Sequence, residues 1–236
     1  MAGEGPVVVV FHGTPGSRLD ARFCSAAAAE AGVEARFVGF DRPGYGSAAS
    51  QPGRSLTSVA EQAAAIVDDQ VRLLAISGGG PFALATAALV ADRVPSVTIV
   101  SGVGPPACGL GALTVVQGKT EAEVEAWAEE IISAEQPAPT GVDVFDLFLA
   151  SQAEGTRSAD GIVKDVLTLR EPWTVDLGAV TAPVTLFHAV DDESCPIEGA
   201  RCLAGALPRA ELVEWRDGGH MAGASHLGEV LSRVLA

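Results

Sequence analysis

The feature that most limits the fold of this chain is an alternation between short apolar runs and longer Ala-rich segments of helical period. Val7–Phe11 contains five apolar residues in succession, and Val97–Val100 is similar. Such runs are typical of strands buried on both faces, as in the centre of a parallel sheet. The helical segments between them supply the crossovers that parallel strands need. The alternation therefore predicts an α/β protein whose parallel sheet is covered by helices on both sides.

This alternation stops after the fourth predicted strand. Between about Gly104 and Thr181 the sequence predicts only helices, and the alternation then resumes. We therefore expect a helical insertion between the fourth and fifth of six strands. The predicted strands are Val7–Phe11, Ala35–Phe40, Val71–Ile76, Val97–Val100, Val184–Phe187 and Glu211–Trp215. The predicted helices are Arg18–Ala31, Leu56–Val67, Pro81–Ala91, Glu121–Ile132, Asp143–Leu149, Ile162–Leu169, Ile197–Leu207 and Leu227–Leu235.

The composition fits a single folded domain with an acidic surface. The chain has 236 residues, 48% of them hydrophobic, and a formal net charge of −15. A chain of this length can bury a substantial core without disulfide or metal support. The negative charge repels phosphate backbones and anionic lipids, so we expect neither nucleic acid nor a membrane as a partner. A small-molecule substrate is the expected ligand.

The cysteines and the first residues bear on where the protein works. Cys24, Cys108, Cys195 and Cys202 are scattered singly, without a spacing typical of zinc binding or redox pairs. We expect core packing as the role of most of them and a reducing compartment for the protein. The first six residues lack the positive charge of a signal peptide, and no apolar stretch is long enough to span a bilayer. These features predict a soluble, cytoplasmic protein.

A serine directly follows the third predicted strand, and a helix follows the serine at once, in Leu73–Pro81 (LLAISGGGP). A turn this sharp strains the serine backbone and needs tiny residues two positions before and after it, here Ala75 and Gly79. The turn holds the Ser77 hydroxyl at a helix N-terminus, where negative charge is favoured. The alternative is a serine that only caps the helix, but capping does not require three consecutive glycines. The segment therefore predicts that Ser77 is a nucleophile.

A serine nucleophile needs a histidine base held by a carboxylate. His220 lies in a loop directly after the last predicted strand, and Asp192 follows the strand that ends near His188. Open α/β sheets place their sites at the carboxyl ends of strands, so we expect His220 as the base and Asp192 as the acid. Of the other histidines, we expect His12 and His188 to be structural and His226 to lie on the surface.

The carbonyl oxygen that gains negative charge during attack needs two N–H donors held in place. We expect one from Gly78, the residue after the nucleophile. The other is expected from the loop after the first strand, 12–17 (HGTPGS). Because Pro15 has no N–H, Thr14 or Gly13 must supply it, and we choose Thr14. The alternative is that this loop is only a Gly/Pro turn.

Several of these segments together resemble the α/β-hydrolase superfamily over nearly the whole chain. The segments are HGTPGS at 12–17, DRPGYGS at 41–47, SGGG at 77–80, Asp192 with Pro196, and GGH at 218–220. The resemblance implies a three-layer α/β fold, an oxyanion-hole donor at Thr14 and a helical cap where the insertion lies. It also places the acid four residues before a proline, which selects Asp192 over Asp191.

The resemblance implies a core formed by residues 1–104 and 182–236 and a cap formed by 105–181. The chain begins almost at its first strand, so we expect the two N-terminal strands typical of the family to be missing and about six to remain. Ala35–Phe40 would then be an edge strand, exposed or paired with a second copy. We hypothesise a homodimer there.

Other residues of the resembling segments receive a structural interpretation. Arg42 is expected to make structural hydrogen bonds rather than to touch substrate. Trp173 lies where the cap rejoins the core, and its role is left open between cap packing and pocket lining. The same two roles stay open for Trp127, Phe145 and Phe148.

These features favour hydrolysis of a small ester, thioester or lactone through an acyl-enzyme on Ser77, with no metal or organic cofactor. The serine argues against haloalkane and epoxide hydrolysis, which need a carboxylate nucleophile on this scaffold. Two alternatives stay open. One is cyclisation, C–C cleavage or acyl transfer at the same site, and the other is a ligand-binding receptor with slow turnover. The sequence does not identify the substrate.

Overall fold

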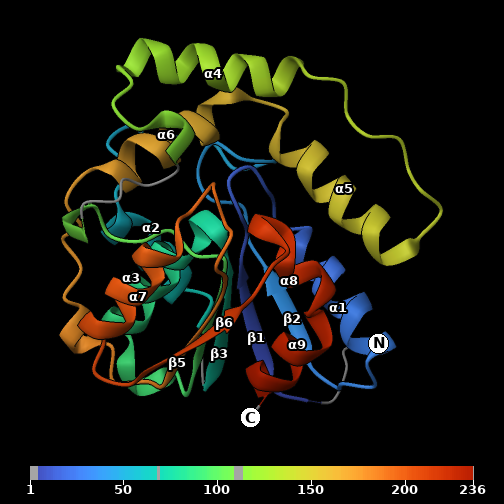
Figure 1. Ribbon diagram of the computed structural model, residues 1–236, viewed down its shortest axis with the longest axis vertical. Coiled ribbons are helices and arrows are strands. Elements are labelled where there is room, and N and C mark those ends of the chain that lie inside the picture. The colour runs from blue at the N-terminus through green and yellow to red at the C-terminus, as the bar shows by residue number, and fades with distance from the viewer. Residues whose placement is uncertain (1–4, 68–69, 109–113, 236) are drawn as a thin grey trace.

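The computed structural model describes residues 5–67, 70–108 and 114–235, which form a six-stranded sheet between two layers of helices (Figure 1). The strand order is β2-β1-β3-β4-β5-β6, and each neighbouring pair is parallel. This three-layer arrangement confirms the predicted fold class. The first four residues, on which the signal-peptide expectation partly rests, lie outside the described ranges.

The strands match the apolar runs of the sequence. Their bounds are β1 (Val7–Phe11), β2 (Arg36–Gly39), β3 (Val71–Ile76), β4 (Val97–Val100), β5 (Val184–Ala189) and β6 (Ala210–Trp215). Most residues of β1, β3, β4 and β5 are buried, as their uninterrupted apolar character predicts. β2 forms one edge of the sheet, which is the place expected for Ala35–Phe40. Pairing of this edge with a second copy stays a prediction.

Helices cover both faces of the sheet (Figure 1). On one face lie α1 (Asp20–Glu30), α8 (Ala222–Ser225) and α9 (Leu227–Leu235), and on the other lie α2 (Leu56–Ala64), α3 (Gly80–Leu89) and α7 (Ile197–Ala206). Residues 80–87 of α3 are all buried, because this helix of Ala, Leu and Phe packs between the sheet and α2. Short 3₁₀ turns are η1 (Ser77–Gly79), η2 (Ala91–Arg93), η3 (Pro106–Cys108), η4 (Thr114–Val116), η5 (Leu177–Ala179) and η6 (Gly219–Met221).

Three helices, α4 (Glu121–Ser133), α5 (Asp143–Gly155) and α6 (Ala159–Arg170), lie between β4 and β5 in the chain and over one end of the sheet in space (Figure 1). α4 packs on α6, and α5 packs on α1. These are the helices that the sequence placed in an insertion. Residues 109–113 of the expected cap lie outside the described ranges. The division into a core, 1–104 with 182–236, and a cap, 105–181, stays a prediction.

A buried cluster of charges joins α6 to the core. Asp165 of α6 accepts hydrogen bonds from Arg42 and Arg54, each at 2.5 Å, and all three side chains are buried. Tyr45 and Thr14 donate to the same carboxylate at 2.7 and 2.6 Å. Burial alone would raise the pKa of Asp165, but the positive charges of the two arginines outweigh burial and lower it to about 2. An ionised carboxylate therefore holds α6 against the loops of the sheet.

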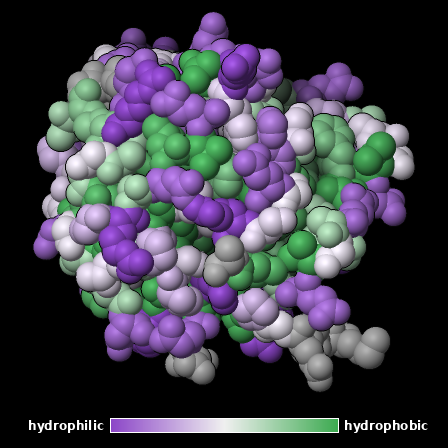
Figure 2. Space-filling view, turned by 60° about the horizontal axis from the view of Figure 1, so that its bottom comes forward, coloured by the Kyte–Doolittle hydropathy of each residue, from purple (hydrophilic) through white to green (hydrophobic). Residues whose placement is uncertain are grey.

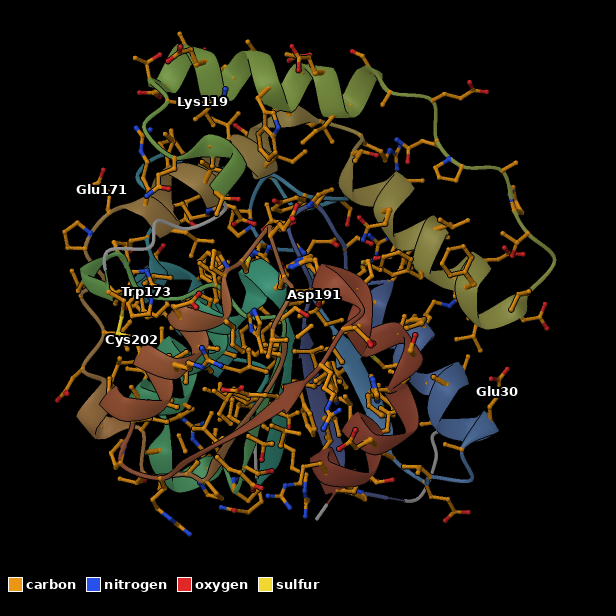
Figure 3. The ribbon with its side chains drawn as sticks, in the orientation of Figure 1. Glu30, Lys119, Glu171, Trp173, Asp191 and Cys202 are labelled. Atoms are coloured by element: carbon orange, nitrogen blue, oxygen red, sulfur yellow. A yellow bond between two sulfur atoms is a disulfide. The ribbon has the colours of Figure 1, made fainter. Side chains whose placement is uncertain are left out.

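A disulfide bond joins Cys108 in η3 to Cys202 in α7, 94 positions apart (Figure 3). The expectation that the cysteines serve mainly in core packing is therefore wrong for this pair. Single cysteines far apart in sequence carry no sign of their pairing, because only the fold brings the two Cα atoms to 6.2 Å. The expectation of a reducing compartment rested on the absence of a disulfide, and the bond between Cys108 and Cys202 removes that ground. Cys24 and Cys195 are both buried.

The surface at the end of the molecule opposite α4 carries hydrophilic residues around and between hydrophobic areas (Figure 2). Over the described chain as a whole, the exposed large hydrophobic side chains are Ile66, Leu89, Val142, Phe145, Val190 and Met221. Within the described ranges, no helix combines the length and the apolar character needed to cross a bilayer.

Replacing Asp165 by Ala would leave the guanidinium groups of Arg42 and Arg54 buried without this carboxylate. Removing one partner of a buried ion pair costs about 3–5 kcal/mol, so we expect Asp165→Ala to lower the free energy of unfolding by about 3 kcal/mol or more. Urea unfolding at pH 7, followed by circular dichroism, measures the change. Glu129→Ala removes an exposed carboxylate from α4 and should change stability by less than about 0.5 kcal/mol. Similar losses in the two variants would contradict the assigned role of the cluster.

Candidate active site

Ser77 lies in the turn that joins β3 to α3. Its φ angle is 49°, in the left-handed region that residues other than glycine seldom adopt. A Cβ atom at Gly79 would lie 2.4 Å from the carbonyl oxygen of Phe11. The chain can therefore turn so close to β1 only with glycine at position 79. The strained turn expected from the sequence is present, and it holds Ser77 at the carboxyl end of β3.

His220 lies between Ser77 and Asp192. Its Nε2 atom is 2.9 Å from Ser77 Oγ, and its Nδ1 atom is 2.8 Å from Asp192 Oδ2. A proton on Nδ1 is donated to the carboxylate, which leaves Nε2 to accept the proton of Ser77. Ser101, at the end of β4, donates a hydrogen bond of 2.9 Å to the carbonyl oxygen of His220 and holds its loop. The structure thus brings together the three side chains predicted from the sequence.

Asp192 is held by donors on both carboxylate oxygens. The N–H groups of Ser194 and Cys195 each donate to Oδ1 at 2.9 Å, while Oδ2 faces His220. Burial alone would raise the pKa of Asp192, but hydrogen bonds from His188, His220 and the Cys195 N–H hold it well below its usual range. Asp192 is therefore ionised and fixed in direction.

His188 has the structural role expected of it and also contacts Asp192. This buried histidine lies at the end of β5, with Nε2 2.6 Å from the carbonyl oxygen of Cys195 and 3.3 Å from Asp192 Oδ2. It therefore contacts Asp192 in addition to packing in the core. Asp191 has a different role from Asp192, since its Oδ1 accepts a hydrogen bond of 2.9 Å from the N–H of Gly219. The structure places Asp192, rather than Asp191, on His220.

The two expected oxyanion-hole residues lie against each other beside Ser77. A Cβ atom at Gly78 would lie 2.3 Å from Thr14 Oγ1, so only glycine allows this approach. Thr14 is fixed by its hydroxyl, which donates to Asp165 Oδ2 at 2.6 Å. Arg42 donates to the carbonyl oxygen of Gly13 at 2.9 Å, which is the structural role expected of it. The loop after β1 is therefore held in place next to Ser77.

The two remaining histidines lie outside the hydrogen-bonded chain of Ser77, His220 and Asp192. His12 is buried and accepts a hydrogen bond of 3.2 Å on Nε2 from the Arg42 N–H. Burial, with the nearby charge of Arg42, lowers the pKa of His12 to about 3. His12 is thus neutral and structural, as expected. His226 is partly exposed and stacks on Trp215 with ring centroids 4.5 Å apart.

A cavity of about 280 Å³ opens at Ser77 and His220. Phe145 and Phe148 of α5 line it, and Phe148 also packs against the core. Trp173 and Trp127 pack against the core instead, and Trp173 lies on the side of α3 and α7 (Figure 3). The described residues around the cavity also include ones that sequence reasoning did not single out: Asp20, Phe23, Cys24, Leu74, Ile76, Val100, Ser101, Gln152, Met221, Gly223, Ala224, Leu227 and Val230.

Asp20, the first residue of α1, is a buried carboxyl at this cavity. Its Oδ2 atom accepts a long hydrogen bond of 3.4 Å from the N–H of Gly13. Burial raises the pKa of Asp20 to about 6, and hydrogen bonds from Ser151 and from the Gly13 N–H oppose burial only in part. No motif of the sequence marked this residue, because a carboxyl at the start of a helix is an ordinary surface feature.

The comparisons with known proteins agree with this architecture. Residues 6–144, more than half of the chain, match the family model of the alpha/beta hydrolase fold. The chain is 26% identical to a pimeloyl-acyl-carrier-protein methyl ester esterase of Chromobacterium violaceum, over 95% of this chain and 91% of that protein.

Two solved structures show the same fold. An alpha/beta hydrolase fold protein from Nakamurella multipartita has a TM-score of 0.69 and 23% identity, covering 99% of this chain and 93% of its own. An esterase from Exiguobacterium antarcticum has a TM-score of 0.73 and 21% identity, again covering 99% and 93%. At these identities the likeness concerns the fold.

The raised pKa of Asp20 predicts a pH-dependent effect of Asp20→Asn. In the unfolded chain this carboxyl ionises near its ordinary pKa of 3.8, but in the folded protein only near 6. The wild type therefore loses stability as the pH rises from about 4 to 6, by roughly 3 kcal/mol for two pKa units. Asn does not titrate and therefore has no such loss. In urea unfolding, the free energy of unfolding of Asp20→Asn relative to the wild type should be higher at pH 7 than at pH 4. A stability difference independent of pH would contradict this.

Proposed function

The chain belongs to the alpha/beta hydrolase fold family, and on that premise we propose that it is a serine esterase with Ser77 as nucleophile, His220 as base and Asp192 as acid. The observation that carries the proposal is the continuous hydrogen-bonded chain from Ser77 Oγ to His220 Nε2 at 2.9 Å and from His220 Nδ1 to Asp192 at 2.8 Å. A serine hydroxyl is a weak nucleophile unless a base removes its proton. This geometry supplies that base, already oriented.

The reaction would proceed through an acyl-enzyme. Ser77 Oγ attacks the ester carbonyl carbon while its proton passes to His220 Nε2. The bond to the alcohol oxygen then breaks, and His220 gives that oxygen the proton. Water next loses a proton to His220 and attacks the acyl-enzyme, and the proton returns to Ser77 as the acid leaves. The fixed, ionised Asp192 supports the positive charge on His220 in each of these steps.

The backbone N–H groups of Thr14 and Gly78 would receive the negative charge on the carbonyl oxygen. Thr14 lines the cavity at Ser77, Gly78 directly follows Ser77 in the chain, and the close approach of the two residues holds their positions relative to each other. An N–H donor that is already in place costs no reorganisation when the charge develops. Asp165 and Arg42 stabilise this loop from the opposite side.

A carboxylic ester is the preferred substrate because the relative from Chromobacterium violaceum is named as a methyl ester esterase. The cavity of about 280 Å³ fits a small substrate. A thioester or lactone would react by the same steps. We assign the helices α4–α6 of segment 105–181 as a cap that shapes this cavity, since Phe145, Phe148 and Gln152 of α5 line it.

Ser77→Ala tests the proposal with a fluorophosphonate probe and a panel of p-nitrophenyl esters. We expect the wild type to become labelled and to turn over esters many times, and the variant to lose labelling and at least about 10³-fold in kcat, as for other serine hydrolases without their nucleophile. Ester turnover that survives in Ser77→Ala would remove the assignment of the nucleophile. Labelling without turnover in the wild type would favour a different reaction or a receptor.

Thr14→Val and Thr14→Ser test the oxyanion loop as a matched pair. Valine keeps the shape and the backbone N–H of Thr14 but cannot donate to Asp165, whereas serine keeps the hydroxyl. We expect Thr14→Val to lower kcat by about tenfold or more with little change in KM, because a misplaced donor loses part of the 10²–10³ that one oxyanion donor contributes. Thr14→Ser should stay within about threefold of wild type. Equal kcat values in the two variants would show that the hydroxyl does not position the loop.

A further inference from the structure

The wall of the cavity at Ser77 is largely apolar. Phe23 of α1, Phe148 of α5 and Leu227 of α9 face it from three different helices, and Leu74 and Val100 face it from the sheet. Phe145 and Met221 also line it and are 41% and 50% exposed, so apolar side chains are present where the cavity meets solvent. An apolar wall of this kind favours apolar groups, because they give up no hydrogen bonds to water when they enter the cavity.

The charges around the cavity are all unfavourable for an anion. Among the described residues that line it there is no Lys or Arg, and the single carboxyl is that of Asp20. The buried arginines Arg42 and Arg54 are engaged by Asp165, and Arg18, two residues before Asp20, is paired with Asp41 and Glu154. The chain as a whole carries a net charge of −15. A carboxylate brought into the cavity would leave water, meet no cation on the wall and approach a second carboxylate.

From this distribution we infer that the cavity receives an uncharged, apolar acyl group and excludes acyl groups that carry a carboxylate, with Asp20 as the specificity-determining residue. The inference rests on the proposed esterase function. The acyl group is assigned to the cavity because it stays bonded to Ser77 through both steps, whereas the alcohol leaves after the first.

Two esters with the same leaving group and the same chain length test the inference. p-Nitrophenyl hexanoate has a neutral acyl chain, and the p-nitrophenyl monoester of adipic acid has a terminal carboxylate on a chain of equal length. At pH 8 we expect kcat/KM to be at least about 100-fold higher for the hexanoate, because a buried, unpaired carboxylate is strongly disfavoured. A ratio below 10 would overturn the inference. So would faster turnover of the 6-aminohexanoic ester, since that would mark the cavity as a cation site.

The variant Asp20→Asn tests whether Asp20 causes the preference for the uncharged ester. Since Asp20 also accepts a hydrogen bond from Gly13, absolute rates can fall for both substrates, but the ratio of the two kcat/KM values cancels that loss. We expect this ratio to fall at least fivefold in Asp20→Asn. Glu30→Gln, at the exposed outer end of the same helix (Figure 3), removes the same charge and should leave the ratio unchanged. A ratio that is equal in Asp20→Asn and wild type would remove Asp20 from the specificity.

Failure of the inference differs from failure of the proposed function. If neither ester is turned over and the fluorophosphonate probe does not label Ser77, the esterase proposal itself is wrong. If both esters are hydrolysed at similar rates and Ser77→Ala abolishes both activities, the esterase proposal holds and only the exclusion of anionic acyl groups is wrong.

Discussion

The carboxylate of Asp165 is the contact on which the arrangement of the site depends. It belongs to α6 in the inserted segment, yet side chains of the core donate to it from several loops, among them Arg42 and Thr14. A buried carboxylate is stable only where such donors surround it. The donors around Asp165 therefore fix the position of α6 on the core. Through Thr14 the same carboxylate reaches the loop beside Gly78. Hydrogen bonds therefore join α6 of the inserted segment to the loop after β1.

Asp192 and Asp20 are both buried near Ser77, but their surroundings shift the pKa values of the two carboxyl groups in opposite directions. Asp192 is surrounded by N–H donors, so it remains ionised and can support a charged His220. At Asp20, burial outweighs the hydrogen bonds from Ser151 and from the Gly13 N–H, so the pKa of this carboxyl rises to about 6. The first carboxylate is hydrogen-bonded to His220. The second faces the cavity at Ser77.

Much of this fold could be predicted from the sequence because local pattern and final structure agree. The runs Val7–Phe11, Val71–Ile76 and Val97–Val100 are strands with those same bounds. The segments around Ser77 and His220 were found because their glycines mark sharp turns at strand ends.

The rest depended on contacts between distant parts of the chain. Asp165 is one acidic residue on a helix with an apolar face, and only the packing of α6 shows that it is buried.

The bond between Cys108 and Cys202 also has a consequence for the intact molecule. It closes a covalent ring that contains all three inserted helices and β5. A single backbone cut by a protease anywhere inside that ring would leave both fragments tethered through sulfur, and the clipped chain would separate only after reduction.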